Sequence, residues 1–585
     1  MAKVIVMPKL GYTQDSGAIA AWLKNEGDTV ERGEALFDVH TDKTVVTVES
    51  SASGTLLKIA LEPEVTVPVL TPVCVIGEPG EDAEAALANH KTLEVADAQD
   101  EGLLDDDDDD DIVEAAEEAV GETTAESYDY DIVVIGAGPG GYETAIKAAQ
   151  VGKKTCIVEA TYFGGTCLNV GCIPTKVMIH TADLVSEIKE SPAYAVTGID
   201  ASAVTVDMKK LQQRKKTVVN TLTGGVQALL RANGVTIENG KGSFIDNHTV
   251  AVGDKQITAE NIIIATGSSV FMPPFIAVEG ENNILTSNEA LDMDELPGTI
   301  AVIGGGVIGI EFAYLLSKLG SKVVVLELMD HILPMVDPEI SGLAQKQMEK
   351  DGVEFNLGAK VKSVKDNHVY YELNGEELDV AADAILMAVG RIPNTEGLNA
   401  EGIGIEFNKR AIAVNEVMQT NIPNIYAIGD VNGKVMLAHT ASHEGMVAVA
   451  HICGDHADMN YDQIPSCIYI NPEISSIGLT EAKAKEQYDN VKVGRFPMMA
   501  NGKSLIEGTT NGMMKVILEG ETGEILGVHI YASHATDMIG EVSVAMSSEL
   551  TADEMIHAIH PHPTVNEALG ETFMSAWLGK AINSL

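Results

Sequence analysis

The sequence contains one pattern twice, and this repeat constrains the fold more than any other feature. The segments YDIVVIGAGPGGYETAIKAAQVGKKTCIVE at 130–159 and TIAVIGGGVIGIEFAYLLSKLGSKVVVLE at 299–327 share the same order. Each reads as a strand, a Gly-x-Gly-x-x-Gly motif, an amphipathic helix and a second strand that ends in an acidic residue. The repeat predicts two dinucleotide-binding βαβ units, each within a doubly wound α/β domain.

The glycines and the terminal acids are the candidate binding residues of the two units. They are Gly136, Gly138, Gly141 and Glu159 in the first unit, and Gly304, Gly306, Gly309 and Glu327 in the second. The glycines let the backbone approach a pyrophosphate at the helix N-terminus, where free N–H groups and the helix dipole favour an anion. The carboxylate then accepts from a ribose 2′-hydroxyl and repels the 2′-phosphate of NADP. Two such sites imply two cofactors that exchange electrons.

Composition limits the class of protein. The chain has 585 residues, of which 45% are apolar and 21% charged, so we expect several compact units of a globular protein. Its formal net charge of −49 argues against nucleic-acid partners and against binding to anionic membranes. The start MAKVIVMPKLGY does not resemble a secretory signal, and no apolar run is long enough for a membrane helix. We expect a cytoplasmic protein without a membrane partner.

Two cysteines lie close together in GGTCLNVGC at 164–172, and they could be metal ligands, a structural disulfide or a redox pair. A zinc site normally brings a second pair of ligands, which does not accompany this segment, so no metal is expected. Residues five apart in an extended chain lie about 16 Å apart, whereas a disulfide needs Cα atoms roughly 4.4 to 6.8 Å apart. The segment must therefore fold back on itself, which Asn169 and Gly171 permit.

The residues after the second cysteine favour the redox alternative. Pro174 is typical of a first helical position, so Cys172 would precede a helix whose positive end stabilises a thiolate. A tight disulfide at such a place is typical of one that is reduced and formed again. The other four cysteines are expected to be solitary core residues: Cys74, Cys156, Cys453 and Cys467.

The segment GGTCLNVGCIPTK, which follows the first glycine motif, resembles the redox loop of the flavin disulfide reductases. Further segments resemble that family in the same order along the chain. ATGS at 265–268, with Gly267, and IYAIGD at 425–430, with Asp430, resemble its FAD-binding segments. VGRIPN at 389–394, with Gly390, resembles the end of its NAD domain, and HPHPTVNE at 560–567 resembles its His-Pro-Thr motif. The resemblance covers almost everything from Tyr128 to the end.

The resemblance implies roles for particular residues. The substrate thiolate would attack Cys167, and Cys172 would leave as a thiolate against the flavin. His562 would be the base and Glu567 would orient it. Lys176, paired with Glu311, would lie near the flavin, although each could instead be an ordinary salt-bridge residue.

CLNVGCIPTK, Glu327 and HATDMIGE at 534–541 favour the branch of the family that oxidises dihydrolipoamide with NAD. The segment AHTASHEG at 438–445 departs from the expected pattern, because Thr440 and His443 stand where charged residues are expected. The region from 463 resembles the dimer interface of the family, so a homodimer is implied. In that dimer His562 would serve the cysteines of the partner subunit.

The first 78 residues form a separate module. Short β-branched runs and turn signals predict an all-β unit, and MPKLGYTQDSGAIAAWLKNEGDTVERGEALFDVHTDKTVVTVES resembles a lipoyl domain. In this resemblance Lys43 carries covalent lipoate at a hairpin tip, although it could be an ordinary exposed lysine.

Residues 81–127 contain nineteen acids and one lysine, including seven aspartates at 105–111, which predicts a solvated, flexible linker.

These observations define the expected architecture. We expect a lipoyl domain at 1–78, an acidic linker at 79–127, an FAD-binding domain at 128–270, an NAD-binding domain at 271–392, an FAD-binding or central domain at 393–462 and an α+β dimerisation domain at 463–585. The expected activity is oxidation of protein-bound dihydrolipoamide with FAD and NAD in a 2-oxoacid dehydrogenase-type complex. The module could also act as a carrier that docks the chain to an acyltransferase core, or pass electrons to a peroxidase or another disulfide partner.

Overall fold

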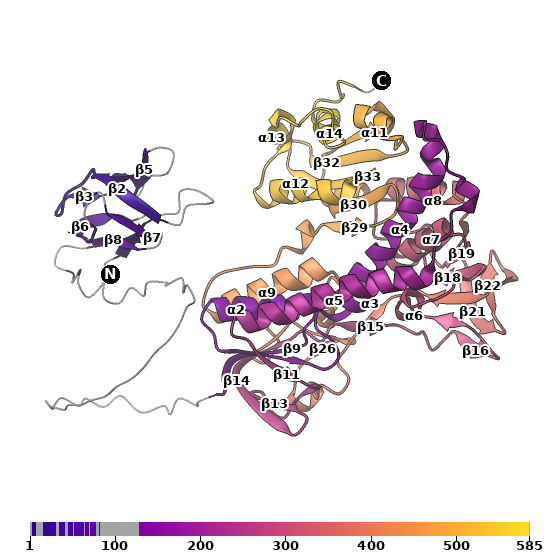
Figure 1. The fold of residues 1–585 in the computed structure, drawn as a ribbon, viewed down its shortest axis with the longest axis horizontal. Helices are drawn as coiled ribbons and strands as arrows, with labels where there is room; N and C mark the ends of the chain where they lie inside the picture. The colour runs from indigo at the N-terminus through magenta and orange to yellow at the C-terminus, as the bar shows by residue number, and fades with distance from the viewer. Residues whose placement is uncertain are drawn as a thin grey trace. The chain divides into compact units, whose positions relative to one another are not determined.

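The structure is a computed structural model, and it forms two compact units, Met1–Glu122 and Thr123–Leu585 (Figure 1). It describes residues 3–7, 16–30, 34–40, 45–50, 52–61, 63, 65–68, 71–77, 81, 83 and 128–583. The two units are called the N-terminal unit and the C-terminal unit. Almost all of the acidic segment 79–127 lies outside the described residues.

The N-terminal unit is a sandwich of two four-stranded sheets. One sheet has the order β1-β8-β6-β3 and the other β5-β4-β2-β7. The strands are β1 Lys3–Val6, β2 Ser16–Trp22, β3 Thr29–Val30, β4 Ala35–His40, β5 Val45–Glu49, β6 Gly54–Ile59, β7 Thr66–Pro68 and β8 Pro72–Gly77. Apolar residues such as Ile19, Phe37 and Leu56 are fully buried between the sheets. Lys43 falls in the sequence between the paired strands β4 and β5, outside the described residues.

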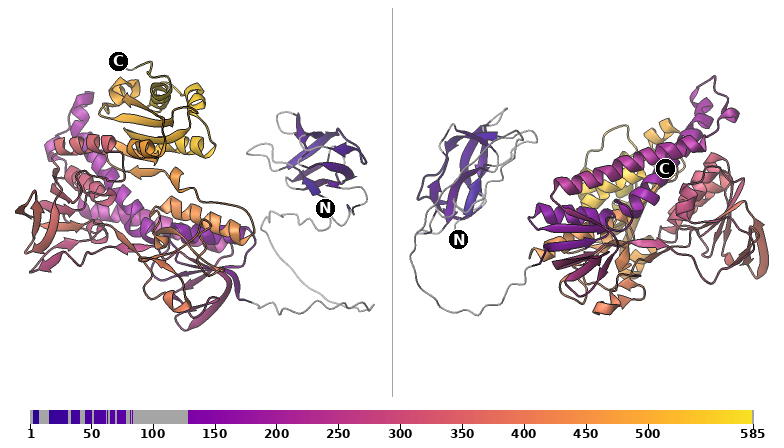
Figure 2. Two further views of the ribbon diagram at one scale, coloured as in Figure 1. Left: turned by 180° about the vertical axis from the view of Figure 1, so that it is seen from behind. Right: turned by 60° about the horizontal axis from the view of Figure 1, so that its bottom comes forward.

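The first glycine motif lies in a seven-stranded sheet of the C-terminal unit. Its order is β11-β10-β9-β14-β13-β12, and β28 pairs with β14. The strands are β9 Tyr130–Ile135, β10 Thr155–Glu159, β11 Thr236–Asn239, β12 Gly242–Phe244, β13 Thr249–Val252, β14 Lys255–Ile264 and β28 Ile425–Ala427. β9 is parallel to β10 and β14, as a βαβ unit requires. Helix α2 (Pro139–Gln150) follows β9, and α9 (Ala438–Ile452) lies along α2 (Figures 1 and 2).

The second glycine motif lies in a five-stranded parallel sheet of order β17-β24-β18-β19-β20. The strands are β17 Ile284–Leu285, β18 Thr299–Ile303, β19 Lys322–Glu327, β20 Glu354–Leu357 and β24 Ala384–Met387. Helices α6 (Ser287–Leu291), α7 (Val307–Leu319) and α8 (Pro338–Lys350) belong to the same region. A further sheet contains β16 Ala277–Glu279, β21 Lys360–Lys365, β22 His368–Leu373 and β23 Glu376–Ala381. Two short sheets have two strands each. One pairs β15 Ser268–Val270 with β25 Arg391–Pro393, and the other pairs β26 Phe407–Asn408 with β27 Ala411–Ile412.

The last part of the chain forms an antiparallel sheet of order β29-β30-β33-β32-β31 with helices around it. The strands are β29 Ser466–Ile468, β30 Glu473–Gly478, β31 Val491–Pro497, β32 Met513–Glu519 and β33 Ile525–Ala532. The helices are α10 Glu481–Gln487, α11 Gly502–Glu507, α12 Ala535–Ser547, α13 Ala552–His557 and α14 Glu567–Trp577. This is the α+β region expected after residue 463.

A buried ion network joins α8 to the last sheet. The ammonium of Lys515 on β32 lies 2.9 Å from Asp337, the N-cap residue of α8, 3.0 Å from Glu339 and 2.8 Å from Glu481. Arg495 on β31 pairs with Glu339 at 2.8 Å and with Glu481 at 2.6 Å. Because Lys515 is buried, its charge depends on these carboxylates for compensation.

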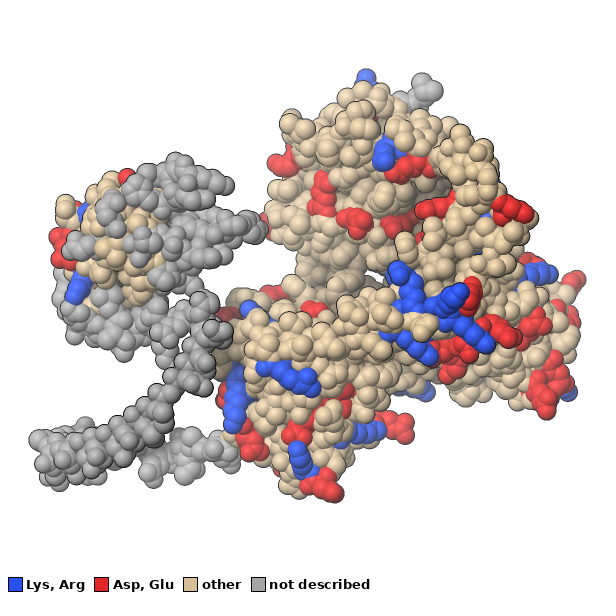
Figure 3. Space-filling model, in the orientation of Figure 1, with Lys and Arg blue, Asp and Glu red and all other residues tan. Residues whose placement is uncertain are grey.

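One helix departs from the acidic character of the chain. Figure 3 shows acidic side chains spread over one face of the C-terminal unit, with lysine and arginine gathered near the N-terminal part of α5 (Met208–Ala232). The sequence of α5 contains no acidic residue, and its exposed cations include Lys209, Lys210, Arg214 and Lys216. Lys215 is buried instead and pairs with Asp292 at 2.6 Å, which ties α5 to the end of α6.

Candidate active site

One cavity of about 2230 Å³ in the C-terminal unit joins the two glycine motifs to the cysteine pair. The predicted site residues that line it are Gly136, Gly138, Gly141, Glu159, Cys167, Cys172, Lys176, Gly267, Gly304, Gly306, Glu327, Gly390 and Asp430. A pocket for one small molecule typically measures about 300 to 1,000 Å³. The volume therefore suits two dinucleotides in contact with one redox pair. Gly309, His562 and Glu567 are not among the lining residues.

The three glycines of each motif have different surroundings. A Cβ on Gly136 would lie 2.3 Å from the carbonyl oxygen of Ala265, and one on Gly141 would lie 1.9 Å from the carbonyl oxygen of Gly136. The first and third glycines are thus required by the tight turn and by packing of the helix against the strand. A Cβ on Gly138 would meet only the Cα of Gly165, at 3.9 Å. The second glycine therefore leaves open space where a pyrophosphate approaches the backbone.

The second motif repeats this arrangement. A Cβ on Gly304 would lie 2.4 Å from a backbone oxygen, and one on Gly309 would lie 2.0 Å from another, so neither position has room for a side chain. A Cβ on Gly306 would meet no atom within 4 Å. Gly136 and Gly304 also have the same φ of 110°, in the region that only glycine adopts readily. Both motifs therefore offer the same cradle, and the residues present fit a dinucleotide in each.

The acid at the end of each unit also binds its own glycine loop. Glu159 accepts from the N–H groups of Ala137 at 2.6 Å and Thr161 at 2.7 Å. Glu327 accepts from the corresponding N–H group of Gly305 and from that of Met329 at 2.7 Å. Both acids are buried and line the cavity. Their predicted contact with a ribose hydroxyl would add to this role in holding the loop.

The cysteine segment is more regular than the sequence suggested. Cys167 lies in a short helix, α3 (Gly165–Val170), and Cys172 is the first residue of α4 (Cys172–Glu190). The segment that was expected to fold back on itself is thus two helices broken at Gly171, whose φ and ψ are −141° and −117°. Helix α4 begins at Cys172, two residues before Pro174, which was expected to occupy its first position. Cys172 therefore lies at the positive end of α4 itself.

The two cysteines are thiols in this structure and are hydrogen-bonded to each other. The hydrogen bond from Cys167, helped by the charge of Lys176, lowers the pKa of Cys172 from 9.0 to about 7. The same hydrogen bond, together with burial, raises the pKa of Cys167. Of the two thiols, Cys172 therefore forms a thiolate more readily, and its predicted place against the flavin stays a prediction.

The remaining cysteines are not all core residues. Cys74 and Cys156 are fully buried, and burial raises the pKa of each to about 12. Cys467 is only partly buried, and Cys453 is exposed, so the expectation of a core position was wrong for Cys453. The residue caps the C-terminus of α9, at the surface.

Lys176 and Glu311 form an ion pair inside the cavity. The ammonium lies 2.9 Å and 2.8 Å from the two carboxylate oxygens. Tyr469 also contacts both residues. The Lys176 ammonium lies 4.3 Å from the centre of the Tyr469 ring, and the backbone N–H of Tyr469 donates to Glu311 at 3.0 Å. Lys176 comes from the cysteine helix α4 and Glu311 from α7, the helix of the second motif. The pair therefore connects the thiols to the second nucleotide unit.

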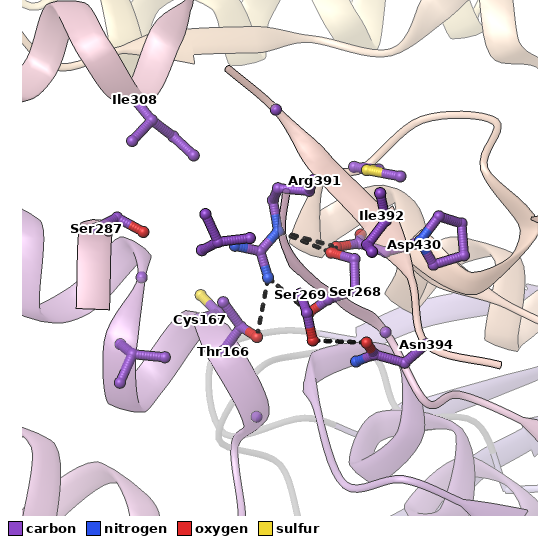
Figure 4. A pocket seen from close by; sticks show the side chains of 18 of the residues that line it. Thr166, Cys167, Ser268, Ser269, Ser287, Ile308, Arg391, Ile392, Asn394 and Asp430 are labelled. Atoms are coloured by element: carbon purple, nitrogen blue, oxygen red, sulfur yellow. Dashed lines mark hydrogen bonds and ion pairs between the residues drawn. The ribbon is translucent and has the colours of Figure 1, made fainter. Parts of the chain in front are cut away.

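Arg391 is a site residue that the sequence interpretation did not single out. Its Nε donates to the hydroxyl of Ser268 at 2.7 Å, and that hydroxyl donates to Asp430 at 2.5 Å. Its Nη2 reaches the carbonyl oxygen of Ser268 at 2.7 Å and the hydroxyl of Thr166 at 3.5 Å. Figure 4 shows these side chains converging on one part of the cavity. The signal in the sequence was a single arginine within VGRIPN, directly after Gly390.

The two histidines near the C-terminus have different surroundings. His562 Nδ1 lies 2.8 Å from Glu567, and 78% of the His562 side chain is exposed. His560 Nε2 lies 2.9 Å from Glu541, but only 9% of its side chain is exposed. The two residues of the predicted pair are thus in contact, yet neither lines the cavity of its own chain. This placement is the one expected if His562 serves a partner subunit.

Among the residues that the structure describes, no group of three or more His, Cys, Asp or Glu side chains is arranged to hold a metal ion. No helix in that part of the chain is both long and apolar enough to cross a membrane.

Comparison with known families identifies the class. Residues 130–445 match the pyridine nucleotide-disulphide oxidoreductases, residues 464–573 match the dimerisation domain of that family, and residues 3–76 match the family described as biotin-requiring enzymes. The chain therefore belongs to the pyridine nucleotide-disulphide oxidoreductases. The expected fold class, the cofactors FAD and NAD, and the N-terminal module of the type that carries lipoate are confirmed by these matches.

Individual proteins narrow the comparison. A dihydrolipoyl dehydrogenase of Bacillus subtilis is 41% identical over 475 residues, which cover 78% of this chain and 99% of the relative. The mitochondrial dihydrolipoyl dehydrogenase of Pisum sativum is 39% identical over 77% of this chain and 92% of its own. Among solved structures, the HOCl-induced flavoprotein disulfide reductase RclA from Escherichia coli is 29% identical, with a TM-score of 0.67 over 76% of this chain and 99% of that chain.

Proposed function

We propose that the chain is a dihydrolipoyl dehydrogenase. Its reaction converts protein-bound dihydrolipoamide and NAD⁺ into lipoamide, NADH and one proton. The observation that carries the proposal is the single cavity in which the thiols of Cys167 and Cys172 meet two dinucleotide cradles. The named relatives from Bacillus subtilis and Pisum sativum support the choice of substrate.

The chemistry begins with the oxidised form of the cysteine pair. The partner subunit's His562 takes the proton of a substrate thiol at Nε2, since Glu567 occupies Nδ1 and fixes the tautomer. The substrate thiolate bonds to the sulfur of Cys167 as the bond between the two cysteines breaks. Cys172 leaves with the electron pair, stabilised as a thiolate by the charge of Lys176 and by its place at the N-terminus of α4.

The second half of the thiol chemistry releases the product. The second substrate thiol attacks the first substrate sulfur and closes the disulfide of lipoamide. Cys167 is released and takes the proton that this thiol gives up. The reduced pair, with Cys167 as a thiol and Cys172 as a thiolate, now holds two electrons from the substrate, while the first proton remains on the partner subunit's His562.

The two cradles would hold the cofactors. Gly136, Gly138, Gly141 and Glu159 would hold FAD together with Gly267, Asp430 and Lys176, and Gly304, Gly306, Gly309, Glu327 and Gly390 would hold NAD. FAD, when bound, supplies an electron acceptor between the dithiol and the nicotinamide. The carboxylate of Glu327 favours NAD, because the 2′-phosphate of NADP would meet a buried negative charge.

The dimerisation domain of the family supports a homodimer in which each cavity is completed by the other subunit. The N-terminal module supports a place among lipoyl domains and the acyltransferase core of a 2-oxoacid dehydrogenase-type complex, with lipoate on Lys43. A cytoplasmic location, expected from the sequence, belongs to the same proposal.

Steady-state kinetics on the purified yellow protein test the proposal. We expect oxidation of free dihydrolipoamide with NAD⁺ and much slower oxidation with NADP⁺. A protein that binds FAD but reduces a partner disulfide with NADH, and does not oxidise dihydrolipoamide, would contradict this substrate. Mass spectrometry of the intact chain tests for lipoate on Lys43.

A further inference from the structure

A buried carboxylate lies behind the turn that carries Asp430. This turn is the 3₁₀ segment Gly429–Asn432, and Asp430 lines the cavity from it. Glu444, on α9, is fully buried. One of its oxygens accepts from the N–H of Gly429 at 2.5 Å and from the side-chain amide of Asn432 at 2.9 Å. Both ends of the turn are thus fastened to one oxygen atom.

The other oxygen of Glu444 faces a different part of the chain. It accepts from the hydroxyl of Tyr461 at 2.5 Å. Tyr461 opens the 3₁₀ segment Tyr461–Gln463, and Gln463 donates to the carbonyl oxygen of Met546 on α12 at 3.2 Å. A single carboxylate therefore links the turn of Asp430 to the beginning of the dimerisation domain.

Close packing fixes the position of α9. A Cβ on Gly445 would lie 1.7 Å from the hydroxyl of Thr144 on α2, and one on Gly140 would lie 2.9 Å from the side chain of Ala441. The helix that carries Glu444 thus rests directly on the helix of the first glycine motif. Glu444 does not line the cavity itself, so any effect on a cofactor acts through the turn.

The free energy needed to bury the carboxylate of Glu444 suggests that this residue has a specific role. A carboxylate taken out of water is destabilised unless donors replace its hydration. Burial raises the pKa of Glu444, and the three hydrogen bonds counteract that shift. Three donors on one buried acid specify the direction of the turn more closely than apolar packing does, because hydrogen bonds are directional.

We propose that Glu444 is a positioning residue for the flavin: it holds the turn Gly429–Asn432 so that Asp430 faces the cofactor, and it ties this turn through Tyr461 to the dimerisation domain. The inference rests on the proposed function only in taking FAD as the group that Asp430 contacts.

The first experiment compares two substitutions of Glu444 by titrating FAD into apoprotein of the full chain. Glu444→Gln retains all three contacts, since its amide oxygen accepts from Gly429 and Asn432 and its NH₂ donates to the Tyr461 oxygen. We expect its Kd for FAD to stay within about threefold of the wild type. Glu444→Leu leaves buried donors without an acceptor, and we expect its Kd to rise by about 10- to 100-fold.

A second pair of variants covers the case in which Glu444→Leu does not fold. Tyr461→Phe removes one donor from Glu444, and we expect a rise in the FAD Kd of about 2- to 10-fold. Tyr314→Phe is the matched control, because Tyr314 also donates to a carboxylate, Asp183, at 2.5 Å, but does not line the cavity. It should leave the FAD Kd unchanged. The visible circular dichroism of bound flavin should change in Tyr461→Phe and not in Tyr314→Phe.

The results separate this inference from its alternatives. Equal losses of thermal stability in both tyrosine variants, with an unchanged Kd and flavin spectrum, would show that Glu444 only supports the fold. A Glu444→Gln protein as impaired as Glu444→Leu would also overturn the inference, since the hydrogen-bond pattern would then not matter. Normal FAD binding without oxidation of dihydrolipoamide would instead contradict the proposed function.

Discussion

The ammonium of Lys176 lies 2.8 Å from a carboxylate oxygen of Glu311, and the two residues come from the cysteine helix and from the helix of the second glycine motif. This ion pair sets a positive charge near Cys172 while a negative charge partly offsets it. The reactivity of the thiols is therefore coupled to the packing between the two nucleotide units.

The first prediction concerns the pKa of Cys172 in the reduced protein. The thiolate should form with a midpoint near pH 7, so alkylation of the Cys172 peptide by iodoacetamide should rise steeply between pH 6 and 8. Cys167→Ala removes the largest stabilising contact and should move the midpoint upward, toward the ordinary value of 9.0. Lys176→Met should move it upward by less. A larger effect of Lys176→Met would show that charge outweighs the hydrogen bond between the thiols.

The second prediction separates the roles of the cysteines. Cys167→Ser and Cys172→Ser should both abolish turnover of dihydrolipoamide while FAD stays bound, because the FAD cradle does not depend on either sulfur. Cys167→Ser should keep a long-wavelength absorbance from a thiolate against the flavin, and Cys172→Ser should lack it. The reverse pattern of spectra would exchange the two assignments.

The third prediction concerns the choice of nucleotide. The wild-type enzyme should strongly prefer NAD⁺ to NADP⁺ in kcat/KM, because Glu327 lies buried where a 2′-phosphate would sit. Glu327→Ala should reduce this preference, mainly by weakening the binding of NAD⁺. The N–H groups of Gly305 and Met329 also lose their acceptor in this variant. Equal efficiency of the wild type with both nucleotides would contradict the assignment.

The fourth prediction compares the two histidines. His562→Gln should slow oxidation of dihydrolipoamide by about 10²- to 10⁴-fold, the usual contribution of a general base. Transfer from NADH to an artificial acceptor should stay almost unchanged, because it needs no thiol deprotonation. His560→Gln is the control: its ring is buried against Glu541, so it should lower thermal stability more than turnover. Comparable losses of turnover at both positions would point to loop geometry instead of one base.

The fifth prediction concerns stability at low pH. Hydrogen bonds from Lys485 and Lys515, together with the charges of Lys515 and Arg495, lower the pKa of Glu481 from 4.5 to about 2. Lys515 also lowers the pKa of Asp337. A lowered carboxyl pKa stabilises the folded state above the unfolded pKa, and this contribution disappears as the pH falls toward the folded value. Denaturant titrations should therefore show a loss of stability between about pH 4.5 and 2.

Lys515→Met provides the matched variant for that prediction. It leaves the buried carboxylate of Asp337 without its cation, and removing one partner of a buried pair typically costs about 3–5 kcal/mol. We expect a cost of that order at pH 7 and a smaller one near pH 3, where the carboxylates begin to accept protons. A cost that does not depend on pH would show that Lys515 contributes packing alone.

Local spacing explains why much of this site could be read from the sequence. Gly136, Glu159 and their counterparts in the second unit belong to one strand-turn-helix-strand segment, so their geometry follows from short-range structure. Arg391 could not be placed in the same way, since its partners Thr166, Ser268 and Asp430 come from three distant parts of the chain. The helix that contains Cys167 was missed because Gly164 and Gly171, which bound it, read equally well as turn residues.

If the exposed pair of His562 and Glu567, which does not line the cavity of its own chain, serves the partner subunit as proposed, each catalytic unit is assembled from two polypeptides. Defects in different chains should then complement one another. If inactive Cys167→Ser and His562→Gln proteins are mixed and allowed to exchange subunits, each mixed dimer regains one intact cavity, formed by the normal cysteines of one chain and the normal histidine of the other. With random pairing, about a quarter of the wild-type activity should return. The same mixture without exchange should remain inactive.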